Sequence, residues 1–157
     1  MTIIPAAILK NPIHCLAFGF GSGLAPKAPG TFGTLMAVPF YLLLAQCSTL
    51  IYALIVLAAF IVGVYLCGKT ADDLGVHDHP GIVWDEFVGF WITMFAAPAG
   101  IVWLIVGFAL FRLFDIWKPW PIKILDDKIE SGFGIMIDDV LAGIYAFAVL
   151  QIAVRVI

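Results

Sequence analysis

The sequence predicts an all-α membrane protein: a polytopic helical bundle of two helical hairpins and a C-terminal membrane helix, with a polar layer on the cytoplasmic side. Composition is the first reason, because 63% of the 157 residues are hydrophobic, the mean hydropathy is +1.09 and only 12% are charged. Soluble domains carry about a quarter charged residues. At this length we expect one membrane-embedded domain over residues 1–157. The second reason is a set of apolar runs at about 34–45, 50–67, 87–96, 101–111 and 140–154.

The positions of the charged residues predict how these runs cross the membrane. The breaks at 46–49 and 97–100 carry no charge, whereas 68–86 and 112–139 hold all eleven acidic residues and five of the eight Lys and Arg. We therefore expect two hairpins that turn on the uncharged side, and the positive-inside rule places the charged side in the cytoplasm. The main alternative is a single straight crossing over 87–111, which would separate the acidic layers onto opposite faces.

Residues 18–35 are rich in Gly and Pro and lead into the first long helix, with Thr31 placed as its N-cap. The free amides and positive dipole end of a helix start attract anions, and glycines let a phosphate approach the backbone. Lys27 could add positive charge. Two interpretations stay open: a phosphate-binding loop, or a loop that packs tightly against neighbouring helices.

Residues 63–70 match the Walker A pattern G-x4-G-K-T, but we expect no nucleotide site there. The pattern requires a strand before a flexible loop, whereas bulky apolar residues here continue a membrane helix. We also expect no nucleic-acid partner, because the net charge is −3 and no basic cluster exists. Nothing in the sequence implies a protein partner.

Two acidic doublets, Asp85-Glu86 and Asp138-Asp139, each stand at the start of an apolar run. Carboxylates repel by roughly 4 kcal/mol at 4 Å and an effective dielectric near 20, so doublets brought together imply a compensating cation. Mg²⁺ takes such oxygen ligands together with substrate phosphate. A favourable interaction with the helix dipole explains a single doublet equally well. The triplet at 77–79, His-Asp-His, suits either a metal or proton-transfer role or an exposed turn.

Arg112, Asp115 and Lys118 follow at spacings of three, on one helical face before Pro119 stops the helix. This stripe suits a structural ladder of ion pairs, and it equally suits a phosphomonoester with its metal.

The acids of the polar stretch before the last helix are expected to behave differently from the doublets. Asp126, Asp127 and Glu130 lie among lysines and are expected at a solvated surface. Asp138-Asp139, in contrast, follow a Gly-containing turn and are expected in the first turn of the last helix.

Four motifs, in one order over roughly residues 18–145, together resemble the phosphatidylglycerophosphatase A family. Each motif alone is a weak signal, but four co-linear motifs are a strong one. They are Gly21-Ser22-Gly23 with Pro26 and Pro29-Gly30-Thr31; Val83-Trp84-Asp85-Glu86 with Gly89; Phe111-Arg112 with Phe114-Asp115 and Lys118-Pro119-Trp120-Pro121; and Gly132 to Gly143 with Met136 and Asp138-Asp139.

The resemblance implies an all-α, Mg²⁺-dependent phosphatase of a bacterial inner membrane that converts phosphatidylglycerophosphate to phosphatidylglycerol, with its site facing the cytoplasm. It also implies residue roles. The metal ligands are expected to be Asp85, Glu86, Asp115, Asp138 and Asp139; the catalytic residues Asp85, Asp115, Asp138 and Asp139; and the phosphate-binding residues Thr31, Arg112 and Lys118. Lys27 and the triplet at 77–79 lie outside the matching pattern.

Water is the expected attacking group, because the sequence has no stretch typical of phosphatases that form a phosphoenzyme. Either Asp138 or Asp85 is expected to accept its proton. The alternative function is a membrane cation carrier or channel that uses the same carboxylates. Carriers place such acids near the middle of their apolar runs, however, whereas these lie at the ends. A non-catalytic scaffold leaves the doublets unexplained.

Overall fold

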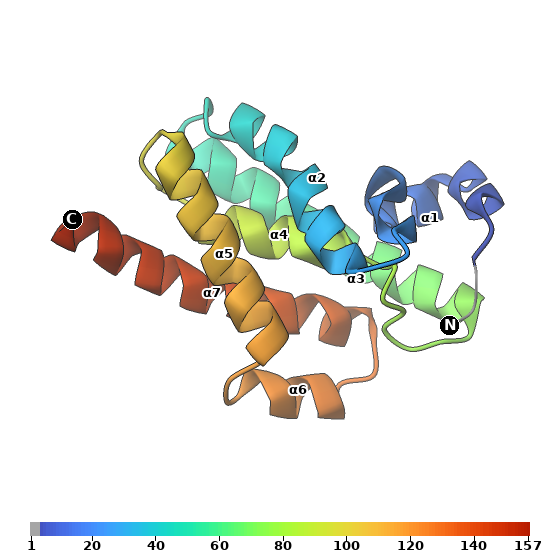
Figure 1. Ribbon diagram of the computed structural model, residues 1–157. Coiled ribbons are helices and arrows are strands. Elements are labelled where there is room, and N and C mark those ends of the chain that lie inside the picture. The colour runs from blue at the N-terminus through green and yellow to red at the C-terminus, as the bar shows by residue number, and fades with distance from the viewer. Residues whose placement is uncertain (1–3) are drawn as a thin grey trace.

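The computed structural model describes residues 4–157, and helices are its only regular elements over that range, which confirms the all-α prediction (Figure 1). Two short 3₁₀ helices and one short α-helix come first, and six further α-helices follow. In chain order the elements are η1 (Ala6–Lys10), α1 (Pro12–Ala17), η2 (Gly19–Leu24), α2 (Pro29–Leu44), α3 (Thr49–Leu74), α4 (Trp84–Thr93), α5 (Ile101–Trp117), α6 (Ile122–Lys128) and α7 (Gly132–Val156).

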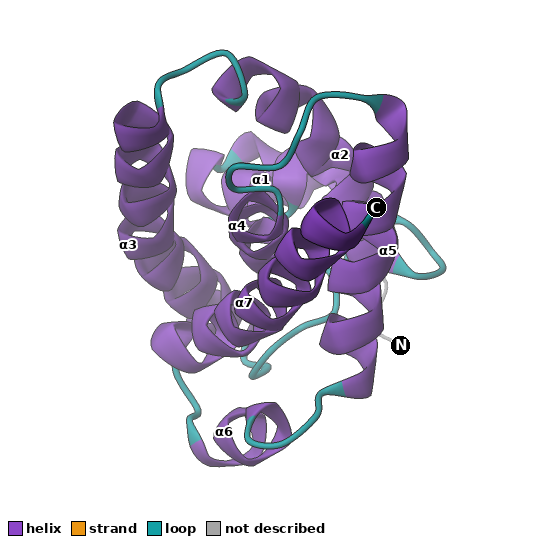
Figure 2. Cartoon of the chain, turned by 90° about the vertical axis from the view of Figure 1, so that its left-hand side faces the viewer, coloured by secondary structure: helices purple, strands orange, loops and turns teal. Residues whose placement is uncertain are grey.

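Helix α4 is short and lies at the centre of the molecule, with α2, α3, α5 and α7 packed around it (Figure 2). Aromatic side chains fasten it to its neighbours. The Trp91 indole donates to the Ala37 carbonyl at 3.1 Å, the Trp84 indole donates to the Ala59 carbonyl at 3.0 Å, and the Tyr52 hydroxyl donates to the Trp91 carbonyl at 2.6 Å. Because α4 is enclosed on all sides, side chains at its ends are held inside the protein.

Glycines allow α4 and α7 to approach closely. A Cβ atom on Gly143 would lie 2.5 Å from the Gly89 carbonyl oxygen, so no larger residue fits there without a backbone shift. The Thr93 hydroxyl donates to the Gly89 carbonyl at 3.0 Å and lies 3.4 Å from the Gly143 carbonyl oxygen. Small residues at a crossing point are typical of packed membrane helices.

The helices break at the two uncharged stretches that the sequence singled out. Helix α2 ends at Leu44 and α3 begins at Thr49, while α4 ends at Thr93 and α5 begins at Ile101. The alternative of one straight helix over 87–111 is therefore wrong. Helix α3 contains the whole of residues 63–70, so the Walker-like stretch is helical, as expected.

The prediction of Thr31 as an N-cap is wrong. Helix α2 begins at Pro29, with Ala28 as the N-cap and no side-chain cap. The physical reason is that proline at the first helical position has a suitable φ and lacks only an amide that would have no partner there. The Thr31 amide donates to the Ala28 carbonyl at 3.0 Å, inside the first turn.

Two helices within residues 4–157, α3 and α7, are long and apolar enough to cross a membrane. Only 22% of the most apolar stretch of α3 is buried in the protein, which is the opposite of a core helix. Large apolar side chains on its surface include Leu50, Leu57 and Ile61. Exposed apolar surface of this extent marks a membrane or partner interface.

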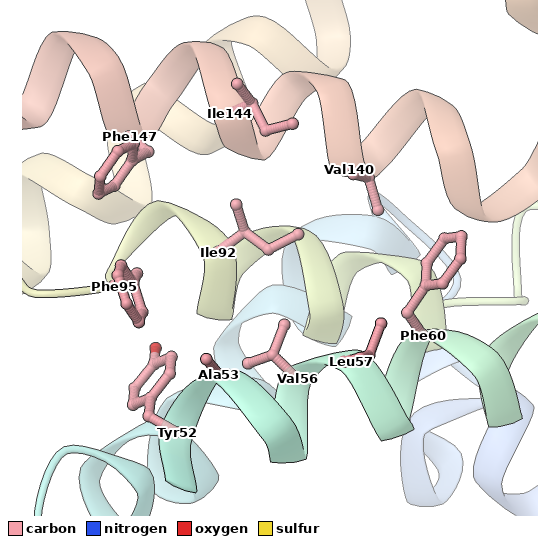
Figure 3. A pocket seen from close by; sticks show the side chains of 10 residues that line it. All are labelled: Tyr52, Ala53, Val56, Leu57, Phe60, Ile92, Phe95, Val140, Ile144 and Phe147. Atoms are coloured by element: carbon pink, nitrogen blue, oxygen red, sulfur yellow. The ribbon is translucent and has the colours of Figure 1, made fainter. Parts of the chain in front are cut away.

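A pocket of about 490 Å³ lies between α3, α4 and α7, and Figure 3 shows the side chains that line it. Its only polar group is the Tyr52 hydroxyl, which is already bonded to α4. Because the lining offers no acid, base or cation, this pocket has no means to carry out chemistry on a phosphate.

Replacing Gly143 with alanine is expected to destabilise the protein by about 1–3 kcal/mol, because the added methyl meets backbone that cannot move freely. Thermal denaturation in detergent, followed by circular dichroism, should show a melting midpoint several degrees lower. The matched control is Gly68→Ala in α3, where the new Cβ would meet its nearest neighbour at 3.4 Å, an ordinary contact. An unchanged midpoint in Gly143→Ala would contradict the close crossing.

Candidate active site

A second cavity, of about 280 Å³, gathers most of the residues that the sequence analysis selected. Its walls come from the start of α2, the loop before α4, the start of α4, the end of α5 and the body of α7. Six carboxylates and only two cationic side chains line it. They are Asp78, Asp85, Glu86, Asp115, Asp138 and Asp139, with Arg112 and Lys118.

Asp85 and Glu86 occupy the first turn of α4, as predicted. No side chain caps this helix start, and Asp85 Oδ1 instead accepts from the Glu86 amide at 3.1 Å. Both residues are at most 8% exposed. The helix dipole favours negative charge at this position, which partly offsets the cost of burial.

Asp138 and Asp139 lie in the second turn of α7, not in the first as expected. The helix begins at Gly132, where Ser131 acts as N-cap and its hydroxyl accepts from the Gly134 amide at 3.3 Å. The glycines therefore belong to the helix instead of preceding it. Asp138 and Asp139 are 4% and 3% exposed, so the whole doublet is held inside the protein.

Asp85, Glu86 and Asp139 form what we call the first carboxylate group. One oxygen from each lies within 4.8 Å of the others, and all three residues are buried. Glu86 Oε2 and Asp139 Oδ2 have no hydrogen-bond partner among the described residues. Buried carboxylate oxygens without partners are costly, so a ligand that satisfies them is strongly favoured. Clustered carboxylate oxygens are the donor set that Mg²⁺ and Mn²⁺ prefer.

Arg112 lies between the acids of two helices. Its guanidinium pairs with Asp115 one turn along α5, as the spacing predicted, and approaches Glu86 Oε1 at 3.8 Å. Its Nε is buried and has no partner within the described part of the chain. The side chain therefore retains donor capacity for an anion that enters the cavity.

Lys118 reaches the cavity in a different way from the predicted helical stripe. Helix α5 ends at Trp117, and Lys118 follows in a left-handed conformation with φ 48° before Pro119. Its Nζ donates to Asp126 Oδ2 at 2.8 Å and to Asp138 Oδ2 at 3.0 Å, with no ion pair to Asp115 within residues 4–157. Burial opposes the charge of this lysine, but the bonds and charges of the two carboxylates outweigh it and raise the pKa of Lys118.

Thr31 does not line the cavity, although Ala28, Pro29 and Gly30 do. The start of α2 thus contributes backbone atoms, and Gly30 leaves space because it has no side chain. A Cβ on Gly30 would lie 2.5 Å from Glu86 Oε1 and 3.1 Å from an Arg112 nitrogen.

The sequence reasoning did not select two acidic residues that lie in or beside the cavity. Asp126, expected at a solvated surface, is only partly exposed to water: its side chain is 27% exposed and is paired with Lys118. Asp78, whose role was left open, lines the cavity; burial raises the pKa of this carboxyl although nearby Lys118 lowers it. No local pattern marks Asp126, since its partner Lys118 lies eight positions earlier, just after the end of α5. Asp127 and Glu130 are exposed, as predicted.

The neighbouring histidines take no part in the cavity lining. His77 is exposed, which agrees with a plain turn. His79 Nδ1 accepts from the Gly81 amide at 2.9 Å, within the same turn. Lys27 is exposed and likewise outside the lining.

Comparison with known proteins places this arrangement in a family. A sequence model of the family described as Phosphatidylglycerophosphatase A matches residues 15–154, a range that contains every residue of the cavity. The chain belongs to the phosphatidylglycerophosphatase A family. No solved structure matches it.

Curated relatives agree with this assignment. The Phosphatidylglycerophosphatase A of Haemophilus influenzae is 54% identical over 90% of this chain and 88% of that protein. The protein of the same name from Escherichia coli (strain K12) is 50% identical over 90% of this chain and 83% of that protein. A Bacteroides thetaiotaomicron protein, whose name proposes a phosphatidylinositol-3-phosphatase, is 41% identical over 86% of this chain and 89% of that protein.

Replacing Gly30 with alanine is expected to slow phosphate release from phosphatidylglycerophosphate by about 10- to 100-fold. The new methyl would displace the Glu86 carboxylate and the Arg112 guanidinium, and small misplacements of such groups have effects of that size. Initial rates of phosphate release in mixed micelles measure the effect, with Gly68→Ala as the control for a methyl added outside the cavity. Wild-type rates in Gly30→Ala would show that this wall of the cavity is not part of the site.

Proposed function

We propose that this protein hydrolyses phosphatidylglycerophosphate to phosphatidylglycerol and inorganic phosphate, as a step of phospholipid biosynthesis. The observation that carries the proposal is the close similarity to two curated phosphatidylglycerophosphatases A over a range that includes the whole cavity. The buried carboxylates with orphaned oxygens, next to Arg112 and Lys118, suit a phosphomonoester and a metal ion. None of the relatives named above is described as a cation carrier, the alternative that the sequence left open.

The proposed location is the bacterial inner membrane, which the chain crosses several times with its cavity facing the cytoplasm. The long apolar helices α3 and α7 support membrane insertion. The cavity lies at the charged ends of the helices, whereas both uncharged breaks lie at their other ends. Trp117 and Trp120, 65% and 77% exposed, stand beside the site where interfacial aromatic residues are expected.

The proposed cofactor is Mg²⁺, held by the first carboxylate group with Asp115 and Asp138 beside it. The donor set fits, because two oxygens of that group are buried and lack partners, and the cavity holds six carboxylates against two cations. When bound, Mg²⁺ supplies a Lewis acid that polarises phosphoryl oxygens and increases the acidity of water.

The substrate phosphate is expected to bind between Arg112 and Lys118. Arg112 retains an unpartnered Nε, and Lys118 uses two of its three donors on carboxylates, so each can donate to a phosphoryl oxygen. Both charges then neutralise the negative charge that spreads over the phosphoryl group in the transition state. Thr31 lies one residue beyond the lining, and a contribution from it would have to pass through the adjacent Gly30 backbone.

A water molecule is the proposed attacking group. Its oxygen forms a bond to phosphorus as one carboxylate, Asp138 or Asp85, accepts its proton. The bond from phosphorus to the glycerol oxygen breaks, and that oxygen takes up the proton, which leaves phosphatidylglycerol and inorganic phosphate. Asp138 Oδ1 is buried without a partner within residues 4–157, so it has a free lone pair for this role.

The variants Asp85→Asn and Asp139→Asn are each expected to lower turnover at least about 100-fold without loss of folded protein. The amide keeps the size of the side chain but removes a metal-binding charge. Phosphate release from purified protein gives the rate, and gel filtration in detergent reports folding. Asp127→Asn is the control, because Asp127 is exposed and outside the cavity. Near-wild-type rates in both variants would remove the first carboxylate group from the mechanism.

Chelation of divalent metal is expected to abolish phosphate release, and added Mg²⁺ is expected to restore it. The physical reason is the uncompensated charge of the first carboxylate group, which no side chain of the cavity neutralises fully. The assay uses purified protein and the lipid phosphate in uncharged detergent, before and after addition of a chelator. Phosphate release that continues at the same rate with chelator would refute the metal role.

A further inference from the structure

A second carboxylate group lies beside the first and consists of Asp78, Asp126 and Asp138. One oxygen from each lies within 4.8 Å of the others. The three residues come from separate parts of the chain: the loop after α3, helix α6 and helix α7. Repulsion between carboxylates at such distances amounts to roughly 4 kcal/mol per pair at an effective dielectric near 20, so this group also requires a cation.

The chain itself supplies a cation at the second carboxylate group. The Lys118 ammonium donates to Asp126 at 2.8 Å and to Asp138 at 3.0 Å, two of the three members. The third member, Asp78, lines the same cavity as Lys118. The lysine is 26% exposed and Asp138 only 4%, so the ion pair is largely shielded from water.

The backbone at Lys118 supports a dedicated placement of this ammonium. Its φ of 48° lies in the left-handed region, which costs a residue with a side chain roughly 1–2 kcal/mol. Helix α6 then folds back so that Asp126 meets the lysine eight positions later in the chain. By contrast, no lysine reaches the first carboxylate group, where Glu86 Oε2 and Asp139 Oδ2 remain without partners in the described structure.

We propose that the Lys118 ammonium takes the place of a second metal ion, so that the protein holds a single divalent cation, on the first carboxylate group. Asp126 and Asp78 are then positioning residues that hold the ammonium beside Asp138. This inference rests on the proposed metal-dependent phosphatase reaction, and it defines the site as one metal ion plus one lysine. Such a pair would hold opposite sides of the substrate phosphate in the way that two metal ions do in other enzymes.

The number of bound metal ions tests the inference without reference to activity. Mn²⁺ is the probe, since carboxylates bind it like Mg²⁺ and unbound Mn²⁺ is counted by electron paramagnetic resonance. The full chain in uncharged detergent is expected to bind one Mn²⁺. Lys118→Met, which removes the charge and keeps an apolar stem, is expected to bind two, because three carboxylates lose their cation. The double variant Lys118→Met with Asp126→Asn is expected to return to one.

The control for this count is Lys123→Met, which removes an exposed lysine of α6 and should leave one bound ion. Two ions on the wild-type protein, or one ion on Lys118→Met, would overturn the inference and leave the proposed function standing. No ion on the wild-type protein would overturn the proposed metal site and the inference together.

The positioning role of Asp126 has its own measurement. Asp126→Asn weakens the hold on the ammonium, and the KM for phosphatidylglycerophosphate is expected to rise about tenfold, as for a lost bond to a charged group, with a smaller change in kcat. Asp127→Asn, one residue along the same helix, is expected to leave both constants unchanged. An equal fall of kcat in both variants, or an unchanged KM in Asp126→Asn, would contradict the assigned role.

Discussion

Burial of like charges is the constraint on which the rest of this structure depends. Asp85, Glu86, Asp138 and Asp139 are each less than a tenth exposed, and a buried ion costs several kcal/mol unless it is compensated. Arg112 and Lys118 compensate only part of this charge, which leaves orphaned oxygens that favour a divalent cation. Three features of the fold bring these charged groups together. Helix α4 lies at the centre, the chain reverses direction after α5, and α6 folds back toward Lys118.

The close crossing of α4 and α7 links the fold to the chemistry. Because Gly89 and Gly143 lack side chains, the two helices approach until their backbones are in contact, and this brings the start of α4 beside the second turn of α7. The first carboxylate group takes its members from both helices. A wider crossing would separate them, so Gly89 and Gly143, which bind nothing themselves, determine whether the carboxylates can share one ion.

Much of the fold could be predicted from the sequence because its signals are local. Apolar runs and uncharged breaks gave the helices and their ends near residues 46–49 and 97–100. The five acidic residues that the motifs selected all line one cavity. Two helix starts and one tertiary contact were not predicted correctly. Proline set the start of α2 ahead of Thr31, and the glycines at 132 and 134 joined α7 instead of preceding it. Asp126, surrounded by lysines in sequence, gained its true partner only through the return of α6, which no local pattern reveals.

The segment between α5 and α7 looks in sequence like an ordinary polar connection, yet it supplies the Lys118 ammonium and the Asp126 carboxylate that holds it beside Asp138. The stretch between Lys118 and Asp126 is therefore a poor place to insert a reporter, a protease site or an epitope, since added residues would lengthen the connection between the two partners of this ion pair. The turn between α4 and α5 at residues 94–100 lies outside the cavity lining and carries no charge. In engineering of this protein, insertions are expected to be tolerated in the turn between α4 and α5 and harmful between Lys118 and Asp126. Loop lengths among its relatives are expected to vary in the first connection and to be preserved in the second.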